Sequence, residues 1–218
     1  MAGRTRVKIC GMTEPSEVEK AVEAGVDALG FIFVKDSPRA IDPEQAREII
    51  AGLPPFVDAV GVFMNESPEG VGEIVNYCGL TVVQLHGQEP PEYCEMMSRR
   101  VIKAFQVRPD MGPDLLEPYN DVVWGFLLDA YHKEMGGGTG ETFDWSLVEK
   151  VQPQKPLILA GGLGVENIAA AIDQVQPFAV DVNSGIESSP GRKDPEQIDA
   201  LFRQVARADN LCGAAIDL

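Results

Sequence analysis

The chain has 218 residues, of which 44% are hydrophobic and 24% are charged, and its formal net charge is −16 at pH 7. These values fit one soluble globular domain with a large core, and so acidic a surface disfavours nucleic acids and anionic membranes as partners. No apolar run approaches the roughly 20 residues of a membrane span. Two histidines and four cysteines without a Cys-x-x-Cys spacing argue against a metal cluster and a disulfide framework. The residues before the first apolar run form no secretory segment, so we expect a reducing, cytoplasmic environment.

Eight apolar segments, rich in β-branched and aromatic residues, predict β-strands. They are Val7–Cys10, Ala28–Val34, Ala59–Met64, Thr81–His86, Val101–Val107, Trp124–Asp129, Pro156–Gly161 and Ala179–Asn183. Their starts lie roughly 20 to 33 residues apart, which is about the length of one βα unit.

Helical patterns occupy the gaps between these strands. The helix predicted after the third strand has Ser67 as its N-cap, Pro68 in its first turn and Gly79 after its end. An identical Asp-Pro-Glu-Gln opening at 42–45 and at 194–197 combines an N-cap, a first-turn proline and a possible capping box. The patterns in the fifth and sixth gaps are weaker.

Strict alternation of strand and helix predicts a parallel sheet covered by helices. Eight units without a break in composition favour a single (β/α)8 barrel domain over 1–218, and an open doubly wound sheet is the alternative. We expect a short C-terminal tail from about residue 209. In such a barrel the functional side chains lie at the C-terminal ends of the strands.

Two candidate catalytic residues end predicted strands. Cys10 precedes a glycine, and Lys8 points to the same face, where its charge favours a thiolate. A cysteine in an apolar strand is more often a small buried side chain, and Cys78 and Cys94 fit that interpretation. Asp129 is followed by a segment that runs into a glycine-rich loop, so a helix-capping role is the weaker interpretation. A thiol and a carboxyl group at strand exits are what an acid–base isomerase needs.

A phosphate site is predicted at the last two strand exits, Gly161-Gly162 and Asn183-Ser184-Gly185. Backbone N–H groups and a helix N-terminus bind phosphate at this place in many barrels. Basic residues are sparse between Arg108 and Arg192, so we expect the backbone to hold the anion.

Four further features complete the predicted site. Arg39, after the second strand, has the guanidinium geometry for a carboxylate, and His86 ends the fourth strand. Asp181 points into the barrel beside Lys8, and burial requires these two charges to form an ion pair. The glycine-rich loop, which includes Gly138 and Gly140, is expected to fold over a bound substrate.

Nine segments give the chain a resemblance to a known family. They are Val7–Thr13, Ala28–Phe33, Ser37–Arg39, Gly61–Phe63, Val83–Gly87, Leu127–Asp129, Gly138–Trp145, Ala160–Leu163 and Val180–Glu187. In order and across all eight units, they resemble the phosphoribosylanthranilate isomerases of tryptophan biosynthesis.

The resemblance implies a (β/α)8 barrel that needs no cofactor or metal and acts as a monomer or homodimer on a small phosphorylated substrate. It implies an Amadori rearrangement with Cys10 as general base and Asp129 as general acid. Arg39 would hold the anthranilate carboxylate, and the last two glycine-rich exits, with Asn183 and Ser184, would hold the phosphate. His86, Asp181 and the glycines of the loop would complete substrate binding.

Two other functions are compatible with such a barrel. One is a related sugar-phosphate isomerase such as the ProFAR isomerases of histidine synthesis, which resemble a pair of aspartates. Cys10 at the first position disfavours this alternative. The other is a non-catalytic phosphate-binding barrel, which the two filled catalytic positions disfavour.

Overall fold

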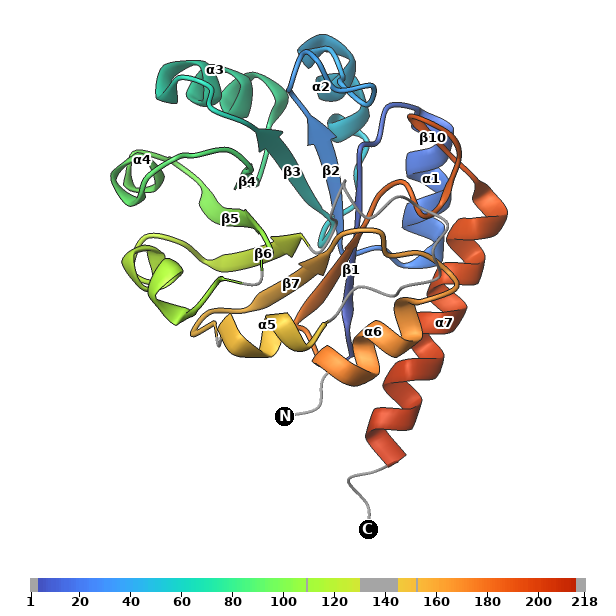
Figure 1. Ribbon diagram of the computed structural model, residues 1–218. Helices are drawn as coiled ribbons and strands as arrows, with labels where there is room; N and C mark the ends of the chain where they lie inside the picture. Colours follow the sequence, from blue (N-terminus) through green and yellow to red (C-terminus); the bar gives the residue numbers. More distant parts are fainter. Residues whose placement is uncertain (1–3, 109, 130–144, 152, 215–218) are drawn as a thin grey trace.

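The computed structural model of the chain describes residues 4–108, 110–129, 145–151 and 153–214. Eight parallel strands close into a barrel in chain order, and β1 pairs with both β2 and β8 (Figure 1). The strands are β1 (Arg6–Cys10), β2 (Ala28–Ile32), β3 (Asp58–Phe63), β4 (Val82–Leu85), β5 (Arg100–Gln106), β6 (Gly125–Asp129), β7 (Leu157–Ala160) and β8 (Ala179–Val182). The predicted (β/α)8 barrel is therefore confirmed, and the alternative of an open sheet is wrong.

Helices cover the outside of the barrel, and a small hairpin follows the last barrel strand. The helices are α1 (Pro15–Ala24), α2 (Pro43–Ala51), α3 (Pro68–Cys78), α4 (Pro91–Glu95), α5 (Ser146–Val151), α6 (Ile168–Val175) and α7 (Pro195–Ala214), with 3-10 turns η1 (Pro113–Leu115) and η2 (Glu117–Tyr119). The antiparallel hairpin consists of β9 (Glu187–Ser189) and β10 (Arg192–Lys193). The weak helical pattern of the fifth gap thus forms two 3-10 turns, because prolines at 113 and 118 interrupt longer helices.

The predicted helix boundaries of α2 and α3 are confirmed by their caps. The Ser67 hydroxyl accepts a hydrogen bond from the Gly70 N–H at 3.1 Å, and the Asp42 carboxylate accepts one from Glu44 at 2.9 Å. Gly79 ends α3 with a φ of 75°, a conformation that favours glycine. These caps bond backbone groups that a helix end leaves without partners.

The core has two layers, because successive side chains of a strand point to opposite faces. Val7 and Ile9 of β1 belong to the large cluster between the sheet and the helices. Cys10 packs with Ile32 and Val62 in a second cluster, inside the barrel. The thiol of Cys10, the candidate general base, is therefore buried in the barrel interior, with 5% of its residue surface exposed.

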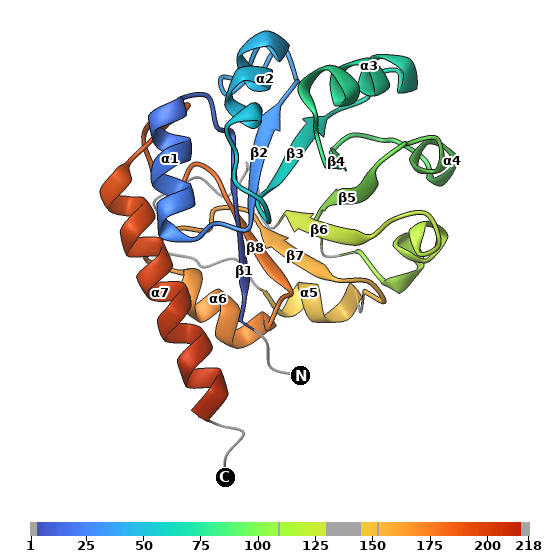
Figure 2. The same ribbon diagram turned by 180° about the vertical axis from the view of Figure 1, so that it is seen from behind.

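The C-terminal segment differs from the expected tail. Helix α7 continues through Asp209 to Ala214, so the segment expected to form a tail begins within this helix. The Asp209 carboxylate accepts hydrogen bonds from the Thr5 backbone N–H at 3.0 Å and from its hydroxyl at 2.7 Å. Figures 1 and 2 both show α7 beside α1, where Lys20 and Asp199 form an ion pair of 2.7 Å. The first and last segments of the chain are thus joined by contacts outside the sheet as well as by the pairing of β1 with β8.

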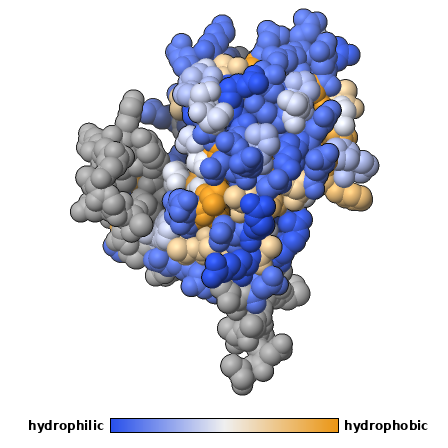
Figure 3. Space-filling view, turned by 90° about the vertical axis from the view of Figure 1, so that its right-hand side faces the viewer, coloured by the Kyte–Doolittle hydropathy of each residue, from blue (hydrophilic) through white to orange (hydrophobic). Residues whose placement is uncertain are grey.

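The outer surface is mostly hydrophilic on the side where α1 and α7 lie in Figure 1, with small hydrophobic areas between the polar ones (Figure 3). Within the described ranges, no helix has the length and apolar character needed to cross a membrane.

Candidate functional site

The C-terminal ends of the strands bring the predicted catalytic groups to one mouth of the barrel. Cys10 ends β1, Asp129 ends β6, and Asp181 lies between them on β8. The Asp181 carboxyl interacts electrostatically with Lys8 on one side and with His86 and Asp129 on the other. The predicted gathering of these residues is therefore found in the structure.

Beneath Cys10, Lys8 and Asp181 form the predicted ion pair. The Lys8 Nζ lies 2.9 Å from each carboxylate oxygen of Asp181. The side chains of Lys8 and Asp181 are only 5% and 7% exposed. Because both oxygens of Asp181 accept from Lys8, this carboxylate forms part of the floor of the site. Each charge compensates the other where burial of a single charge would cost several kcal/mol.

Gly30 provides the space for this arrangement. It is the register partner of Cys10 on the neighbouring strand. A Cβ atom at this position would lie 2.8 Å from the Cys10 Sγ and 3.0 Å from the Lys8 Nζ. Any larger residue at position 30 would therefore displace the thiol or the ammonium group. Sequence analysis missed this role, because a glycine within an apolar strand carries no signal of what it contacts.

The thiol of Cys10 has an altered acidity. Burial raises the pKa of Cys10, the Lys8 ammonium lowers it, and the Asp181 carboxylate raises it again. The net result is a pKa above the ordinary value of 9.0. Lys8 thus acts in the predicted direction, toward the thiolate, but burial and Asp181 outweigh it. Burial opposes the charge on Lys8 too, but Asp181 outweighs it and raises the pKa of Lys8.

On the opposite side of the mouth, His86 faces Asp129. The His86 Nε2 lies 3.7 Å from an Asp129 carboxylate oxygen, and both side chains are about 30% exposed. The Gln84 amide nitrogen lies 3.1 Å from the His86 Nδ1. An amide NH₂ group only donates, so this contact requires Nδ1 of His86 to act as the acceptor. This side of the site is more open than the side of Cys10.

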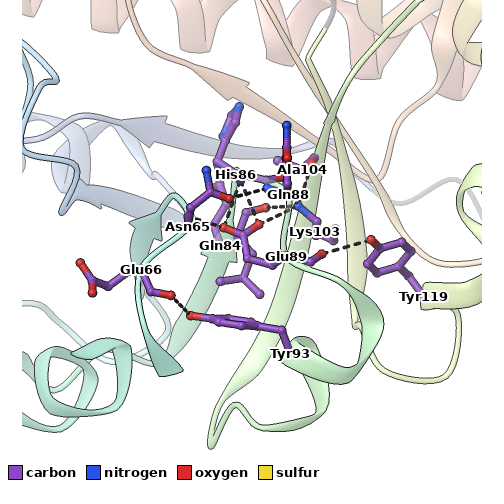
Figure 4. A network of polar contacts seen from close by, with 12 residues as sticks. Asn65, Glu66, Gln84, His86, Gln88, Glu89, Tyr93, Lys103, Ala104 and Tyr119 are labelled. Atoms are coloured by element: carbon purple, nitrogen blue, oxygen red, sulfur yellow. Dashed lines mark hydrogen bonds and ion pairs between the residues drawn. The ribbon is translucent and has the colours of Figure 1, made fainter. Parts of the chain in front are cut away.

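A buried ion pair supports the loop that begins with His86 (Figure 4). The Lys103 Nζ donates to the Glu89 carboxylate at 2.9 Å and to the Gly87 carbonyl at 2.8 Å. The same carboxylate accepts from the backbone N–H groups of Gly87 at 2.9 Å and Asn65 at 2.7 Å. Sequence analysis missed this network. Its only signal was the charge of Lys103 in the middle of an apolar strand.

Arg39 lies in the loop after β2, as predicted, but within the protein it is paired. Its Nε and Nη2 donate to the two carboxylate oxygens of Glu187 at 2.8 and 2.7 Å. Burial of Glu187 opposes its ionisation, but the hydrogen bonds from Arg39 and Lys193 lower its pKa to about 2. Nη1 is the group of Arg39 that this bidentate pair leaves for a ligand.

Lys193 of the hairpin strand β10 is the residue that sequence analysis missed most clearly. Its Nζ lies 2.8 Å from a Glu187 carboxylate oxygen, 2.7 Å from the Asn183 Oδ1 and 3.2 Å from the Asn183 carbonyl oxygen. Its side chain is completely buried. Burial lowers the pKa of Lys193, whereas Glu187 and Cys10 raise it. Lys193 thus connects the candidate ligand Asn183 with the pair formed by Glu187 and Arg39.

The two predicted phosphate-binding exits lie against each other. Gly164 and Gly185 form an isolated parallel bridge between the loops after β7 and β8. A Cβ on Gly164 would come within 2.8 Å of the Gly185 carbonyl oxygen, so this contact requires glycine. Gly161 and Gly162 form the turn after β7, both with positive φ, and Gly162, like Ser184 and Gly185, is exposed.

The N-terminus of α6 completes this part of the mouth. The Asn167 Oδ1 accepts from the Gly164 N–H at 2.9 Å, and its Nδ2 donates to the Gly162 carbonyl at 3.0 Å. The other predicted glycines, Gly138 and Gly140, lie outside the described residues, and so does the whole segment 130–144.

Comparisons with known proteins agree on one family. The model of the N-(5'-phosphoribosyl)anthranilate (PRA) isomerase family matches residues 7–204. An N-(5'-phosphoribosyl)anthranilate isomerase of Moorella thermoacetica is 53% identical over 205 residues, which are 94% of this chain and 91% of the relative. The crystal structure of the Thermotoga maritima phosphoribosyl anthranilate isomerase is 44% identical with a TM-score of 0.83, and covers 93% of this chain and 99% of its own. A second similar structure, 42% identical with a TM-score of 0.80 and coverage of 93% and 99%, is a complex with reduced 1-(o-carboxyphenylamino)-1-deoxyribulose 5-phosphate.

Proposed function

The chain belongs to the phosphoribosylanthranilate isomerase family, and we propose the roles of its residues in the reaction. The enzyme isomerises N-(5'-phosphoribosyl)anthranilate to 1-(o-carboxyphenylamino)-1-deoxyribulose 5-phosphate in tryptophan biosynthesis. Cys10 is the general base and Asp129 the general acid of an Amadori rearrangement. The observation that carries the proposal is their position at the exits of β1 and β6, at one mouth of the barrel. The alternative of a histidine-pathway isomerase, whose chemistry resembles a pair of aspartates, is disfavoured because the first position is Cys10.

The reaction adds one proton to the ribose ring oxygen and removes another from C2′. Asp129 donates a proton to the ribose ring oxygen, and the ring opens as the anilino nitrogen forms an iminium ion. Cys10, as the thiolate, then removes the proton from C2′. The electron pair of the broken C2′–H bond neutralises the iminium ion and gives an enol amine, which tautomerises to the ketose. The burial that raises the pKa of Cys10 makes its thiolate the stronger base. Both groups end the turnover in the opposite protonation state, so a proton must pass from Cys10 to Asp129 before the next.

Binding is assigned to the remaining residues around the mouth. The Nη1 of Arg39 binds the anthranilate carboxylate, while Glu187 holds the other edge of the guanidinium. Backbone N–H groups near Gly162 and Gly185 bind the phosphate, helped by Ser184. His86 faces the ribose beside Asp129, and Asp181 contributes its charge from the floor of the site.

The proposal is tested by turnover and by an anion-bound structure. We expect the purified chain to consume phosphoribosylanthranilate, and the loss of substrate fluorescence measures this turnover. In crystals grown with phosphate, the anion is expected within about 3 Å of backbone N–H groups near Gly162 and Gly185. An anion held by lysine or arginine side chains alone would contradict the assignment of the phosphate site.

Two properties of the whole protein are part of the proposal. A Thermotoga maritima structure that is 40% identical, with a TM-score of 0.82, contains monomers generated by mutation from a dimeric isomerase, and this natural dimer supports a homodimer over a monomer. Sedimentation equilibrium distinguishes the 23.6 kDa of one chain from twice that mass. The free thiols of Cys10, Cys78 and Cys94 support the cytoplasm as the compartment, which cell fractionation tests.

A further inference from the structure

The ammonium group of Lys193 lies where two substrate-binding side chains meet. Its three hydrogen bonds go to Glu187 and to both the backbone and the side-chain oxygen of Asn183. An ammonium group has three N–H bonds, so these acceptors use all of them. With a fully buried side chain, Lys193 has no part in contact with solvent or with a ligand. Apart from the charge of Lys193, which also acts on the Cys10 thiol, its effect on the reaction must pass through the groups that it contacts.

The first effect concerns the orientation of the Asn183 amide. The two ends of an amide have similar shapes, and a flip exchanges a donor for an acceptor. An ammonium group only donates, so the 2.7 Å contact requires the oxygen of Asn183 to face Lys193. The NH₂ group must then point away from Lys193, as a donor. Asn183 follows β8 and begins the loop of the proposed phosphate site, so a donor directed away from Lys193 is available on the side where the proposed function puts substrate oxygens.

The second effect concerns Arg39. The Glu187 Oε1 accepts from both the Lys193 Nζ and the Arg39 Nε, at 2.8 Å each. The carboxylate therefore lies between two cations, and Lys193 fixes the oxygen that in turn fixes the guanidinium. The three groups carry a net charge of about +1, which favours an anionic ligand. The side chain of Glu187 is only 4% exposed, so water screens these charges weakly.

The neighbouring residue of β10 makes different contacts. Arg192 is about half exposed and pairs with Glu14 and Glu17 near the start of α1. The two consecutive cations of β10 thus differ in direction: one anchors the hairpin to α1, and the other lies under the mouth of the barrel. This difference supplies a matched control.

We propose that Lys193 is a positioning residue of the isomerase, which directs the Asn183 amide donor toward the substrate and fixes Arg39 through Glu187. The inference rests on the proposed binding roles of Asn183 and Arg39. It does not depend on the roles of Cys10 and Asp129, because neither residue takes part in these contacts.

The test is the affinity for reduced 1-(o-carboxyphenylamino)-1-deoxyribulose 5-phosphate, measured by calorimetry, which requires no turnover. Lys193→Met is expected to weaken binding by about tenfold or more, and to raise KM more than it lowers kcat, because the lost interactions are already made in the bound ground state. If this variant does not fold, Lys193→Gln retains one donor group. Arg192→Met is the control, with affinity expected within about twofold of the parent.

A double-mutant comparison separates positioning from general stabilisation. In a background with Asn183→Ala and Arg39→Met, Lys193→Met is expected to change the affinity by less than about twofold, and any loss smaller than in the parent supports the proposal. An equal loss in both backgrounds, or no loss in the parent, overturns it. Weak turnover by the parent with tight binding of the analogue would instead count against the proposed acid and base.

Discussion

The two sides of the barrel mouth are built differently. On the side of Cys10, the thiol and the Lys8–Asp181 pair are all nearly inaccessible to solvent. On the side of Asp129, the carboxyl and His86 are each about 30% exposed and lie 3.7 Å apart, beyond ordinary hydrogen-bonding distance. The proposed base is thus surrounded by buried charges, whereas the proposed acid is partly exposed to water. The two groups of one reaction therefore differ sharply in their burial.

Removal of the proposed base should have the largest effect on turnover. Cys10→Ser is expected to lower kcat on the order of 10²-fold or more, because a serine hydroxyl is far too weakly acidic to form the required anion. The substitution is nearly isosteric, so circular dichroism should remain that of the parent. Cys78→Ser, in the buried face of α3, is the control for loss of a thiol away from the mouth. Near-normal turnover of Cys10→Ser would remove Cys10 from the mechanism.

The more exposed half is tested by Asp129→Asn. We expect kcat to fall by about 10²-fold with KM within about threefold of the parent, because proton delivery to the ring oxygen occurs only in the transition state. Steady-state kinetics with varied substrate separate the two parameters. Damage confined to KM would identify Asp129 as a binding residue instead.

The charges around Glu187 should make stability depend on pH. The folded-state pKa of Glu187 is about 2, below its ordinary 4.5, so its contribution is fully present above about pH 4.5 and is lost as the pH falls toward 2. The shift corresponds to at most about 3 kcal/mol. Urea unfolding of the parent and of Glu187→Gln between pH 7 and pH 3 measures it. The difference in unfolding free energy should shrink toward low pH, and a constant difference would refute the assigned cause.

The smallest expected effect sharpens the description of the buried side. Lys8→Met should change the alkylation rate of Cys10 by less than about tenfold at each pH, because loss of the lysine also removes the reason for Asp181 to stay ionised. The opposing charges of Lys8 and Asp181, which act most strongly on the thiol, then disappear together. Iodoacetamide labelling with peptide mapping, which distinguishes Cys10 from Cys78 and Cys94, provides the rates. A change of a hundredfold or more would show that Lys8 alone controls the thiol.

Much of this architecture could be predicted from local patterns in the sequence. Strand and helix periods and caps such as Ser67 report on neighbouring residues, so the eight units emerged in order. The positions of Cys10 and Asp129 then followed, because all strand exits of a parallel barrel lie at one end. The Lys8–Asp181 pair could be predicted because the alternation of side chains and the closure of the barrel leave one partner for each charge.

The remaining features depend on contacts that no local pattern encodes. Arg39 and Glu187 are 148 residues apart and lie outside the barrel strands, so nothing in the sequence indicated that they would pair. The net acidity of Cys10 depends on the balance of burial and Asp181, which raise its pKa, against Lys8 and Lys193, which lower it, and only coordinates provide this balance. The continuation of α7 was missed because Arg207, Asp209 and Asn210 interrupt the apolar pattern after Val205.

The closure of the barrel also determines when this protein can complete its fold during synthesis. β1 must pair with β8, and Thr5 must bind Asp209, a partner made 204 residues later. Until β8 has been synthesised, the first strand therefore has an unpaired edge on one side. Such an edge can pair with other chains, so the nascent protein is expected to depend on rapid synthesis or on chaperones until β8 and α7 emerge.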